Sequence, residues 1–441
     1  MSTGDAPLKG GAMNRCYSIG LAAVLIMVLM VSTTRAGGLA LYEISTPEVG
    51  LAAAGWSARA QDASTAFTNP AGMTRLNQSQ MLGGIQPLYV NAQFDTDESS
   101  FGGGDGGNAG GWVPAAGLYY VHDLAPQWKL GVAAASYFGL GLDYDDSWSG
   151  RYYVTEAELL TFGISPTVAY EVSPRLSIGA GPTLMYGKLD QKAAINNAAT
   201  GDTQPDGSPF PDGKLKFDEG DIGVGGVVGV LIEPRDDTRF GITYLFEVEF
   251  DFDDAASLNN LGPTLSSVTA GLRNTKVDLD LSIPQMLMAS AYHDLTDKLA
   301  LMANIGWQDW SAFGKQEFTL RSETTTSLTK DLNFKDTWHV AVGAQYRIYS
   351  DWVWSVGMAY DSSPVDDEDR TPDLPLDRQI RVGTGLQYHW QDNITVGLAY
   401  EYLDAGDAEI DQTGGPLQGN LEGDYDSNEI HFFNFNVIWK F

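Results

Sequence analysis

From about residue 80 to the C-terminus, apolar side chains recur at every second position of the chain. The segment 380–390 places Ile380, Val382, Thr384 and Leu386 on one face and Arg381, Gly383, Gly385 and Gln387 on the other. The same alternation is found in the segments 338–348, 352–360 and 394–402. Because successive side chains of a strand point to opposite faces, this period of two predicts β-strands with one apolar face.

The connections between these segments are of two kinds that alternate strictly. Six are short and rich in Pro, Asp, Ser and Asn, as tight turns require, namely Asp123–Gln127, Val172–Arg175, Glu233–Asp237, Asp294–Lys298, Tyr349–Asp351 and Trp390–Asn393. Seven are long and polar, near 96–111, 141–155, 191–213, 254–273, 323–332, 363–377 and 405–424. Together these connections join fourteen strands, an even number, with short turns on one side and long loops on the other.

This asymmetry is typical of outer-membrane barrels, which have brief periplasmic turns and extended extracellular loops. A sheet that faces lipid must close on itself, because an unpaired backbone group is costly where no water is present. The chain ends on an aromatic residue, Phe441, which is a common feature of bacterial barrels. The sequence therefore predicts an all-β protein in which residues 80–441 form a 14-stranded antiparallel transmembrane β-barrel in the bacterial outer membrane.

The first 36 residues are predicted to be an export signal that is removed. Lys9 and Arg15 precede the apolar run Ile19–Val31, and Thr34-Arg35-Ala36 has the small-x-small pattern that precedes cleavage. The run is shorter than the roughly 20 apolar residues with which a helix spans a bilayer. The only cysteine, Cys16, lies before the run, so the exported chain has no thiol for disulfides, catalysis or metal binding.

The charge of the chain is strongly negative and concentrated in the predicted loops. Removal of residues 1–36 changes the formal charge from −31 to −33, with 23 Lys and Arg against 56 Asp and Glu. Such a chain repels nucleic acid. The acidic clusters lack the spacing of a twelve-residue calcium loop, so we expect solvated loops that face lipopolysaccharide, bridged to it by divalent cations. No metal site and no cofactor are predicted.

Residues 37–79 do not follow the strand pattern. They are rich in small residues, contain Pro47 and Pro70, and precede the first strand. The lumen of a barrel of this size is either watery or filled. We therefore expect this segment to fold inward as a plug, or hatch.

Stretches that span nearly the whole exported chain resemble the FadL-type family of outer-membrane long-chain fatty-acid transporters, which also includes proteins for hydrocarbon uptake. The resemblance is carried by 60–76, with its Asn-Pro-Ala element at 69–71, and by Phe138-Gly-Leu-Gly141, Trp148-Ser-Gly-Arg-Tyr152, Asp309-Trp-Ser311, Lys335-Asp-Thr-Trp338 and Pro372-Asp373 before Arg378. It implies a hatch-closed barrel of fourteen strands. It also implies a route in which an apolar ligand is captured among the loops and passes to an inner pocket. The ligand then leaves through a lateral exit in the wall, which hatch movement and an inward kink of the third strand open. Such transport is diffusion and needs no energy source.

The resemblance implies roles for two groups of residues. The gate group consists of Phe67, Asn69, Pro70, Ala71 and Gly72, for which the alternative is a turn that simply packs the plug. The kink group consists of Phe138, Gly139 and Leu140, for which the alternative is an ordinary strand exit to a loop.

Two cations are candidates to bind the carboxylate of a fatty acid in an apolar pocket. Lys188 matches a position where the family can carry a basic pocket residue, and Arg151 lies in a matched loop. For each, a structural ion pair with one of the many carboxylates is an equal alternative. If neither residue lines the pocket, a neutral aromatic or aliphatic hydrocarbon becomes the preferred ligand.

Other functions are less consistent with the sequence. A general diffusion porin needs a wet, charged constriction and no plug. An enzymatic barrel needs a catalytic constellation, and the five scattered histidines show no paired spacing and no Ser/His/acid pattern, so no enzyme is predicted. The partners expected are a long-chain fatty acid or another hydrophobic ligand, with outer-membrane lipid around a monomeric barrel.

Overall fold

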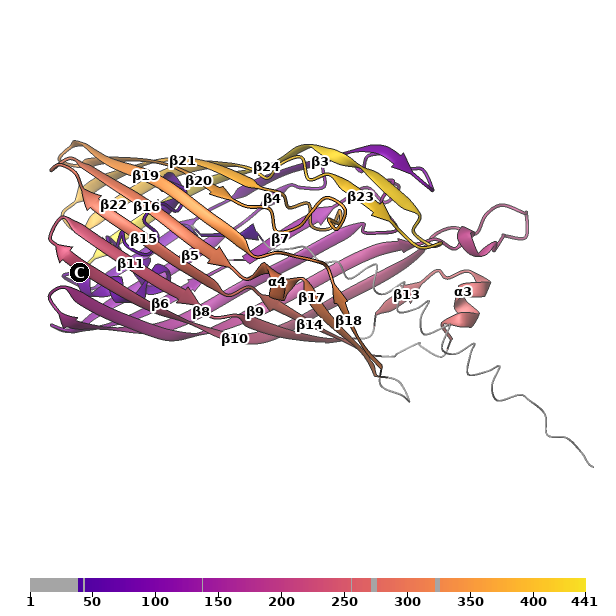
Figure 1. Ribbon diagram of the computed structural model, residues 1–441, viewed down its shortest axis with the longest axis horizontal. Coiled ribbons are helices and arrows are strands. Elements are labelled where there is room, and N and C mark those ends of the chain that lie inside the picture. The colour runs from indigo at the N-terminus through magenta and orange to yellow at the C-terminus, as the bar shows by residue number, and fades with distance from the viewer. Residues whose placement is uncertain (1–38, 43, 137, 255, 271–275, 322–325) are drawn as a thin grey trace, which may run out of the picture.

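The computed structural model describes residues 39–441 with the exception of residues 43, 137, 255, 271–275 and 322–325. Long antiparallel strands dominate the described part and form a barrel (Figure 1). The export signal predicted for residues 1–36 lies outside the described residues and stays a prediction.

Fourteen strands form the wall, and several of them consist of two segments. In chain order, within the described residues, they are β2 (Gln80–Ile85) with β3 (Leu88–Ser99), β4 (Trp112–Val113) with β5 (Ala116–Ala125), β6 (Trp128–Ala135) with β7 (Phe138–Asp143), β8 (Glu156–Ser173), β9 (Leu176–Ile195), β10 (Gly213–Arg235), β11 (Thr238–Leu245) with β12 (Val248–Asp254), β14 (Lys276–Ile283) with β15 (Met286–Asp294), β16 (Leu299–Gln308) with β17 (Lys315–Arg321), β18 (Thr326–Asp331) with β19 (Thr337–Tyr349), β20 (Trp352–Asp361), β21 (Gln379–Gln391), β22 (Ile394–Asp404) and β24 (Asn420–Lys440). Neighbours pair antiparallel, and β24 pairs with β2 and β3, which closes the sheet. The predicted fold is confirmed.

The remaining described elements are short. They are β1 (Leu39–Ala40), β13 (Ser257–Asn259), β23 (Ile410–Thr413), α2 (Thr65–Thr68), α3 (Pro263–Val268), α4 (Trp310–Phe313) and the 3-10 helices η1 (Pro47–Leu51), η2 (Pro70–Arg75) and η3 (Ala198–Thr200). No helix in the described part of the chain has the length and apolar character needed to cross a membrane.

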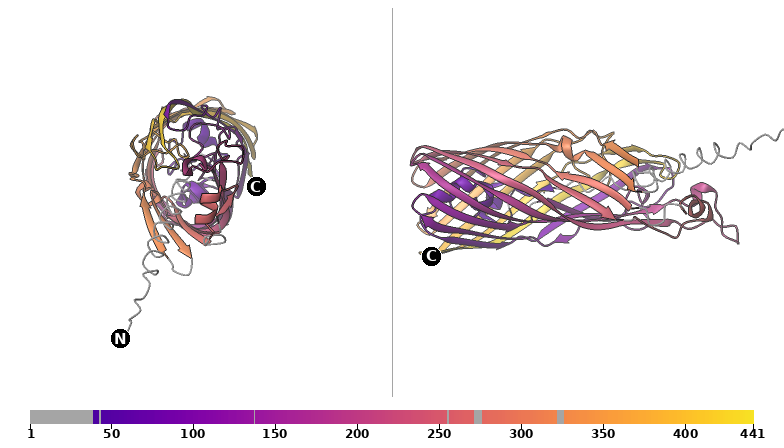
Figure 2. Two further views of the ribbon diagram at one scale, coloured as in Figure 1. Left: turned by 90° about the vertical axis from the view of Figure 1, so that its right-hand side faces the viewer. Right: turned by 90° about the horizontal axis from the view of Figure 1, so that it is seen from below.

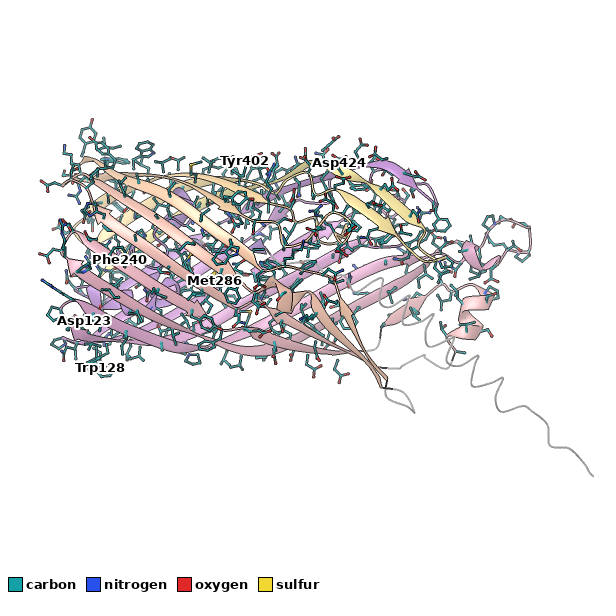
Figure 3. The ribbon with its side chains drawn as sticks, in the orientation of Figure 1. Asp123, Trp128, Phe240, Met286, Tyr402 and Asp424 are labelled. Carbon is teal, nitrogen blue, oxygen red and sulfur yellow. The ribbon has the colours of Figure 1, made fainter. Side chains whose placement is uncertain are left out.

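The alternation read from the sequence separates the two faces of the wall. On β21, Ile380 and Val382 are 39% and 47% exposed, whereas Arg381 between them is 1% exposed. Side chains cover the outer wall along its length, with Trp128 at the turn end and Asp424 at the loop end (Figure 3). All six short turns lie where the sequence predicts them, since strands end and restart on either side of each.

Three of the seven predicted long loops contain a further strand: 254–273 includes β13, 405–424 includes β23, which pairs with the start of β24, and 323–332 includes β18. β18 pairs with β17 in a four-stranded sheet made of β12, β14, β17 and β18. This sheet lies at the loop end of the barrel in Figure 1. The sequence of β18 is polar, because a strand that extends beyond the lipid needs no apolar face. Alternation of apolar and polar residues therefore does not reveal this strand.

The N-terminal segment lies inside the barrel, near the end with the short turns (Figure 2). Most side chains between Leu41 and Leu76 are buried. Hydrogen bonds fix this segment to the wall: the N–H of Gly55 donates to Asn304 on β16 at 2.7 Å, and the N–H of Ser57 donates to Ser290 on β15 at 3.0 Å. This geometry fits the predicted plug, while its role as a moving hatch stays a prediction.

Candidate ligand cavity and hatch

A small apolar cavity lies between the N-terminal segment and the loop half of the wall. Its lining residues are Leu41, Tyr42, Trp56 and Phe67 from the N-terminal segment, Phe138 from β7, and Leu245, Ile283, Pro284, Met286, Gln308 and Trp310 from the wall and its loops. No charged side chain is among these described residues. The cavity volume is about 30 Å³, whereas ligand pockets usually have about 300–1,000 Å³, so a ligand needs side chains to move before it fits.

An interruption of the third wall strand turns Phe138 toward this cavity. The register of that strand against β8 shifts by one residue between the pairs Ala135↔Gly163 and Gly139↔Leu160. Beyond the interruption, β7 takes β1 of the N-terminal segment as its second neighbour. The break lies where the kink was predicted, and the backbone of Leu140 lies within β7 just beyond it.

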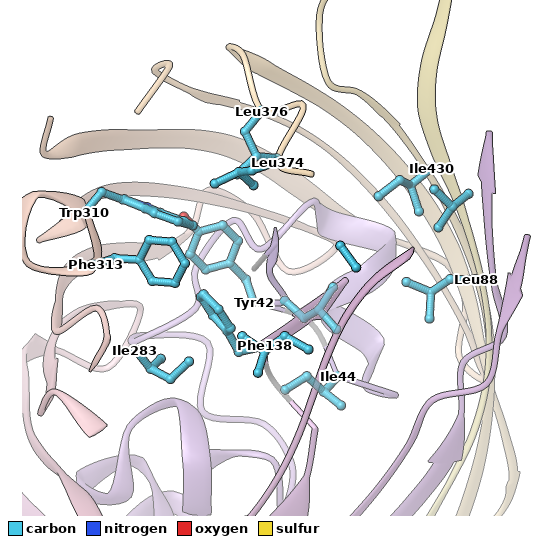
Figure 4. Close-up of a cluster of buried hydrophobic side chains, with 14 of the residues drawn as sticks. Tyr42, Ile44, Leu88, Phe138, Ile283, Trp310, Phe313, Leu374, Leu376 and Ile430 are labelled. Atoms are coloured by element: carbon cyan, nitrogen blue, oxygen red, sulfur yellow. The ribbon is translucent and has the colours of Figure 1, made fainter. Parts of the chain in front are cut away.

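Trp310, on the loop helix α4, lines the cavity, and Phe313 of the same helix packs against it. The rings of Trp310 and Phe313, both on α4, lie 6.0 and 6.3 Å from the ring of Phe138 between their centroids (Figure 4). The carboxylate of Asp309 caps α4 by accepting from the N–H of Ala312 at 3.3 Å, which fixes the turn that presents the rings. Sequence reasoning did not assign Trp310 to the pocket, although Asp309-Trp-Ser311 was among the stretches that carried the resemblance.

The five predicted gate residues lie together in the hatch. Phe67 lines the cavity and its ring lies edge-on to that of Trp56, 5.9 Å away between centroids. Pro70 and Ala71 pack against β9, where a Cβ added at Gly179 would lie 2.5 Å from the N of Ala71. Gly72 allows a close approach as well, because a Cβ there would lie 2.9 Å from the Cβ of Ala60.

Asn69 ties this element to the hatch and to the wall. Its Nδ2 donates to the carbonyls of Ser57 at 2.7 Å and Val230 on β10 at 3.1 Å. Its Oδ1 accepts from the N–H of Ala71 at 3.1 Å. A single buried amide therefore satisfies three backbone groups, which is how an Asn at this position holds the hatch in register with the wall.

We expect Asn69→Ala to loosen the hatch, because it leaves those three backbone groups without their present partner, at about 1–3 kcal/mol for each group that stays unpaired. The measurement is ion conductance of the purified barrel in a planar bilayer, which should rise above that of the wild type. Thr74→Ala is the matched control, since Thr74 is only partly buried and its hydroxyl bonds one carbonyl and Ser177. Equal conductance of the two variants would count against this role of Asn69.

A cluster of charged side chains lies behind Tyr42. The hydroxyl of Tyr42 donates to Asp361 at 2.8 Å, and Asp361 also accepts from His339 at 2.9 Å. The guanidinium of Arg381 lies 3.4 Å from Asp361 and 3.5 Å from Glu401. Sequence reasoning missed this cluster. The signal was the position of Arg381 on the polar face of a membrane strand, where a costly buried cation needs partners.

The structure places neither predicted cation at the cavity. Lys188 lies on the outer face of β9, the same face as the exposed Tyr186, and its Nζ is 3.4 Å from Asp218 on β10. Arg151 lies among the loops, where its Nε is 3.1 Å from Asp212 and its Nη1 donates to the carbonyls of Gly102 and Trp148. Both residues therefore form structural ion pairs, which was the alternative to a role in binding. Lys188 occupies an outward position of β9, and the side chain of Arg151 is held by hydrogen bonds to neighbouring loops.

A family model described as outer membrane protein transport protein (OMPP1/FadL/TodX) matches residues 27–441. The chain belongs to this family. A long-chain fatty acid transport protein of Escherichia coli O6:H1 is 26% identical over 408 residues, which are 86% of this chain and 90% of that protein. Outer membrane protein P1 of Haemophilus influenzae is 28% identical over 418 residues, covering 86% of this chain and 88% of its own.

Solved structures share the fold. A Pseudomonas aeruginosa FadL homologue superposes with a TM-score of 0.82 at 21% identity, covering 92% of this chain and all of its own. The Pseudomonas putida toluene transporter TodX superposes with a TM-score of 0.66 at 15% identity over the same share of each chain. This FadL-family member is therefore an outer-membrane transporter of hydrophobic compounds, in a family made up of transporters and channels and not of enzymes.

Proposed function

We propose that this family member carries long-chain fatty acids passively across the outer membrane. The observation that carries the proposal is the apolar cavity enclosed between the hatch and the wall, with Phe67 of the hatch and Phe138 of the interrupted strand on its surface. The relatives that match over most of this chain and are named for fatty-acid transport support the choice of cargo.

Transport then requires the hatch to move. The cavity of about 30 Å³ is too small for an acyl chain, so binding must displace side chains that Asn69 and its neighbours now hold against the wall. Cargo bound from the loop side pushes against Phe67, which is two residues before Asn69 in the chain. Residues 37–79 are accordingly proposed to act as the hatch of a barrel formed by 80–441, and the gradient of cargo supplies the driving force.

A second candidate cargo is a neutral aromatic or aliphatic hydrocarbon. The described residues that line the cavity carry no cation, and neither Arg151 nor Lys188 reaches it. Behind Tyr42, two carboxylates flank the guanidinium of Arg381, so that cluster has no excess positive charge for a third carboxylate even with His339 protonated. Because its lining carries no cation, the cavity has no charge that would favour a fatty acid over an uncharged hydrocarbon.

An uptake assay separates the two candidates. The chain is expressed in a strain that lacks its own fatty-acid transporter, and the initial rates for radiolabelled oleate and for toluene are compared. We expect oleate uptake well above the empty-vector rate, while a rate that rises for toluene alone would replace fatty acids by hydrocarbons as the cargo. Large steady ion currents through the unliganded barrel would instead indicate a general diffusion porin.

We also propose that the barrel works as a monomer surrounded by outer-membrane lipid. The pairing of β24 with β2 and β3 joins the last described strand to the first, so neither of these strands offers a free edge for a second copy to extend. The acidic loops are proposed to face lipopolysaccharide, with divalent cations between the two sets of negative charges. We expect light scattering of the detergent-solubilised protein to give a protein mass equal to that of one chain.

A further inference from the structure

Four rings form a row across the outer face of the wall, on four neighbouring strands. Tyr402 of β22 lies opposite His431 of β24. His431 in turn lies opposite Tyr89 of β3, which lies opposite Trp112 of β4. The centroids of successive rings are 5.5, 6.2 and 5.2 Å apart, and Trp112 is 66% exposed. We call these four residues the ring row.

The ring row lies where the outward side chains of the wall change from apolar to charged. On β24, the outward side chains from Trp439 to Phe433 are apolar, and Glu429 follows beyond His431. At about 3.3 Å per residue and a tilt of about 40°, the stretch from Trp439 to His431 rises about 20 Å, close to the roughly 25 Å height of the apolar band of such barrels. Figure 3 accordingly shows Tyr402 on the outer wall between the turn end and the loop end. The ring row is therefore at the outer boundary of the lipid, on the side of the long loops.

Hydrogen-bonding groups form the edge of the ring row that faces the loops. Glu429 accepts from the hydroxyl of Tyr402 at 2.8 Å and from the Nδ2 of Asn91 at 3.1 Å. The Nε2 of His431 lies 3.8 Å from the same carboxylate, and its Nδ1 lies 2.8 Å from the hydroxyl of Tyr400. The side chains of His431 and Glu429 are 26% and 29% exposed, so a molecule that lies on the wall can reach both. Ionisable side chains on a membrane-facing surface are costly, which makes these two residues candidates for a function.

Apolar side chains form the opposite edge of the ring row, toward the short turns. Phe433 lies next to the row, with its ring 5.9 Å from that of Trp112 between centroids. One step further toward the turns, Leu398, Phe435 and Ile85 lie opposite one another and are 61%, 42% and 58% exposed. From the turns toward the loops, this face therefore offers an apolar surface, then flat rings, then hydrogen-bonding groups.

We propose that the ring row binds the sugar headgroup of the glycolipid that forms the outer leaflet, lipopolysaccharide. The order of the three zones matches such a lipid. Its acyl chains lie on the apolar edge, its sugar rings lie flat on Tyr89 and Trp112, and its hydroxyl groups donate to Glu429. Sugar rings present apolar C–H faces that pack on aromatic rings, and the amphipathic rings of Trp and Tyr suit this level of the membrane.

The charges beside the ring row favour a sugar over a bare phosphate. Glu429 lies opposite Asp404 on the loop side of the row, and two carboxylates at this level repel an anion but accept hydrogen bonds from hydroxyl groups. The phosphates of the glycolipid are then left to the divalent cations proposed above for the acidic loops. This inference uses the outer-membrane location of the barrel and does not depend on the cargo.

Binding of two lipids to the purified barrel, in detergent with Mg²⁺ and measured by native mass spectrometry, tests the proposal. One lipid is lipid A with its first two core sugars. The other is cardiolipin, which also has several acyl chains and two phosphates but no sugar ring. We expect the wild type to bind the sugar-bearing lipid about tenfold more tightly than cardiolipin.

Trp112→Leu with Tyr89→Leu keeps the surface apolar but removes the flat rings. This double variant should weaken binding of the sugar-bearing lipid about tenfold and leave cardiolipin binding unchanged. The matched control is Trp128→Leu with Tyr170→Leu, another cross-strand pair of rings, 4.6 Å apart between centroids at the turn end of the wall. The control should leave both affinities unchanged.

Glu429→Leu removes the acceptor and places there a side chain that suits a lipid-facing wall. It should weaken binding of the sugar-bearing lipid several-fold, with cardiolipin binding retained. The shift in gel mobility on heating verifies that each variant is a folded barrel.

Three results would overturn the proposal. Equal affinity of the double ring variant and its control for the sugar-bearing lipid would leave the rings as an interfacial belt that only anchors the barrel. An equal loss of affinity for both lipids in the double ring variant would indicate a surface for acyl chains or phosphates and not for sugars. A Glu429→Leu variant with wild-type affinity would show that the hydrogen-bonding edge takes no part in recognition.

Discussion

Arg59→Met is expected to release the hatch and make the barrel conduct ions. The side chain of Arg59 is 1% exposed and forms ion pairs with Glu48 at 2.6 Å and Asp62 at 2.5 Å. Burial by itself lowers the pKa of Arg59, but attraction to Asp62 and Glu48 outweighs it and raises that pKa above its ordinary value, so the residue is charged throughout the physiological range. Removing one partner of a buried ion pair costs about 3–5 kcal/mol, because the remaining charge is left uncompensated.

Planar-bilayer conductance of the purified protein measures this release. The single variant leaves two buried carboxylates facing each other, whereas the triple variant Glu48→Gln, Arg59→Met and Asp62→Asn removes all three charges at similar volume. We therefore expect high conductance from Arg59→Met and a partial return to the closed level in the triple variant. A single variant that stays as tight as the wild type would show that the ion cluster does not hold the hatch.

Gly357→Val is expected to push the hatch away from the wall at another point. Gly357 faces inward on β20, and a Cβ there would overlap the carbonyl oxygen of Leu51 at the end of η1. The contact involves backbone atoms on the hatch side, so no side chain can rotate to make room. Overpacking a filled interior costs about 1–3 kcal/mol, and a valine is otherwise well suited to a strand.

Trypsin cleavage after Arg59, which is buried in the wild type, reports this displacement. We expect rapid cleavage in Gly357→Val while the wall itself stays protected. Gly83→Val is the matched control, because a Cβ at Gly83 meets only the side chain of Leu118, at 3.7 Å. Cleavage at equal rates in both variants would mean that valine loosens the barrel in general and not the seating of η1.

The two variants disturb different contacts of the hatch. Arg59 holds the hatch together internally, and Gly357 lets its backbone touch the wall. If both release the hatch, transport should become less selective as well as leaky, because the cavity loses Phe67 and Trp56 from its lining together.

The sequence by itself determined the barrel and its strand number, and it predicted that residues 37–79 fold inward. These follow from local information: a period of two along each strand, turn residues at each short connection, and a segment that lacks both. Arg381 on the polar face of its strand was also legible, because inward and outward positions alternate along this stretch of β21.

Only the tertiary structure decided which residues meet across strands and between the hatch and the wall. The members of the ring row come from four strands, and their alignment depends on the register that each pair of strands adopts. Lys188 turned outward to Asp218 because the parity of β9 is set by its pairing with β8 and β10. The physical reason is that register and closure come from the summed pairing and packing of the entire wall, whereas the alternation within one strand fixes only the two faces available to each side chain.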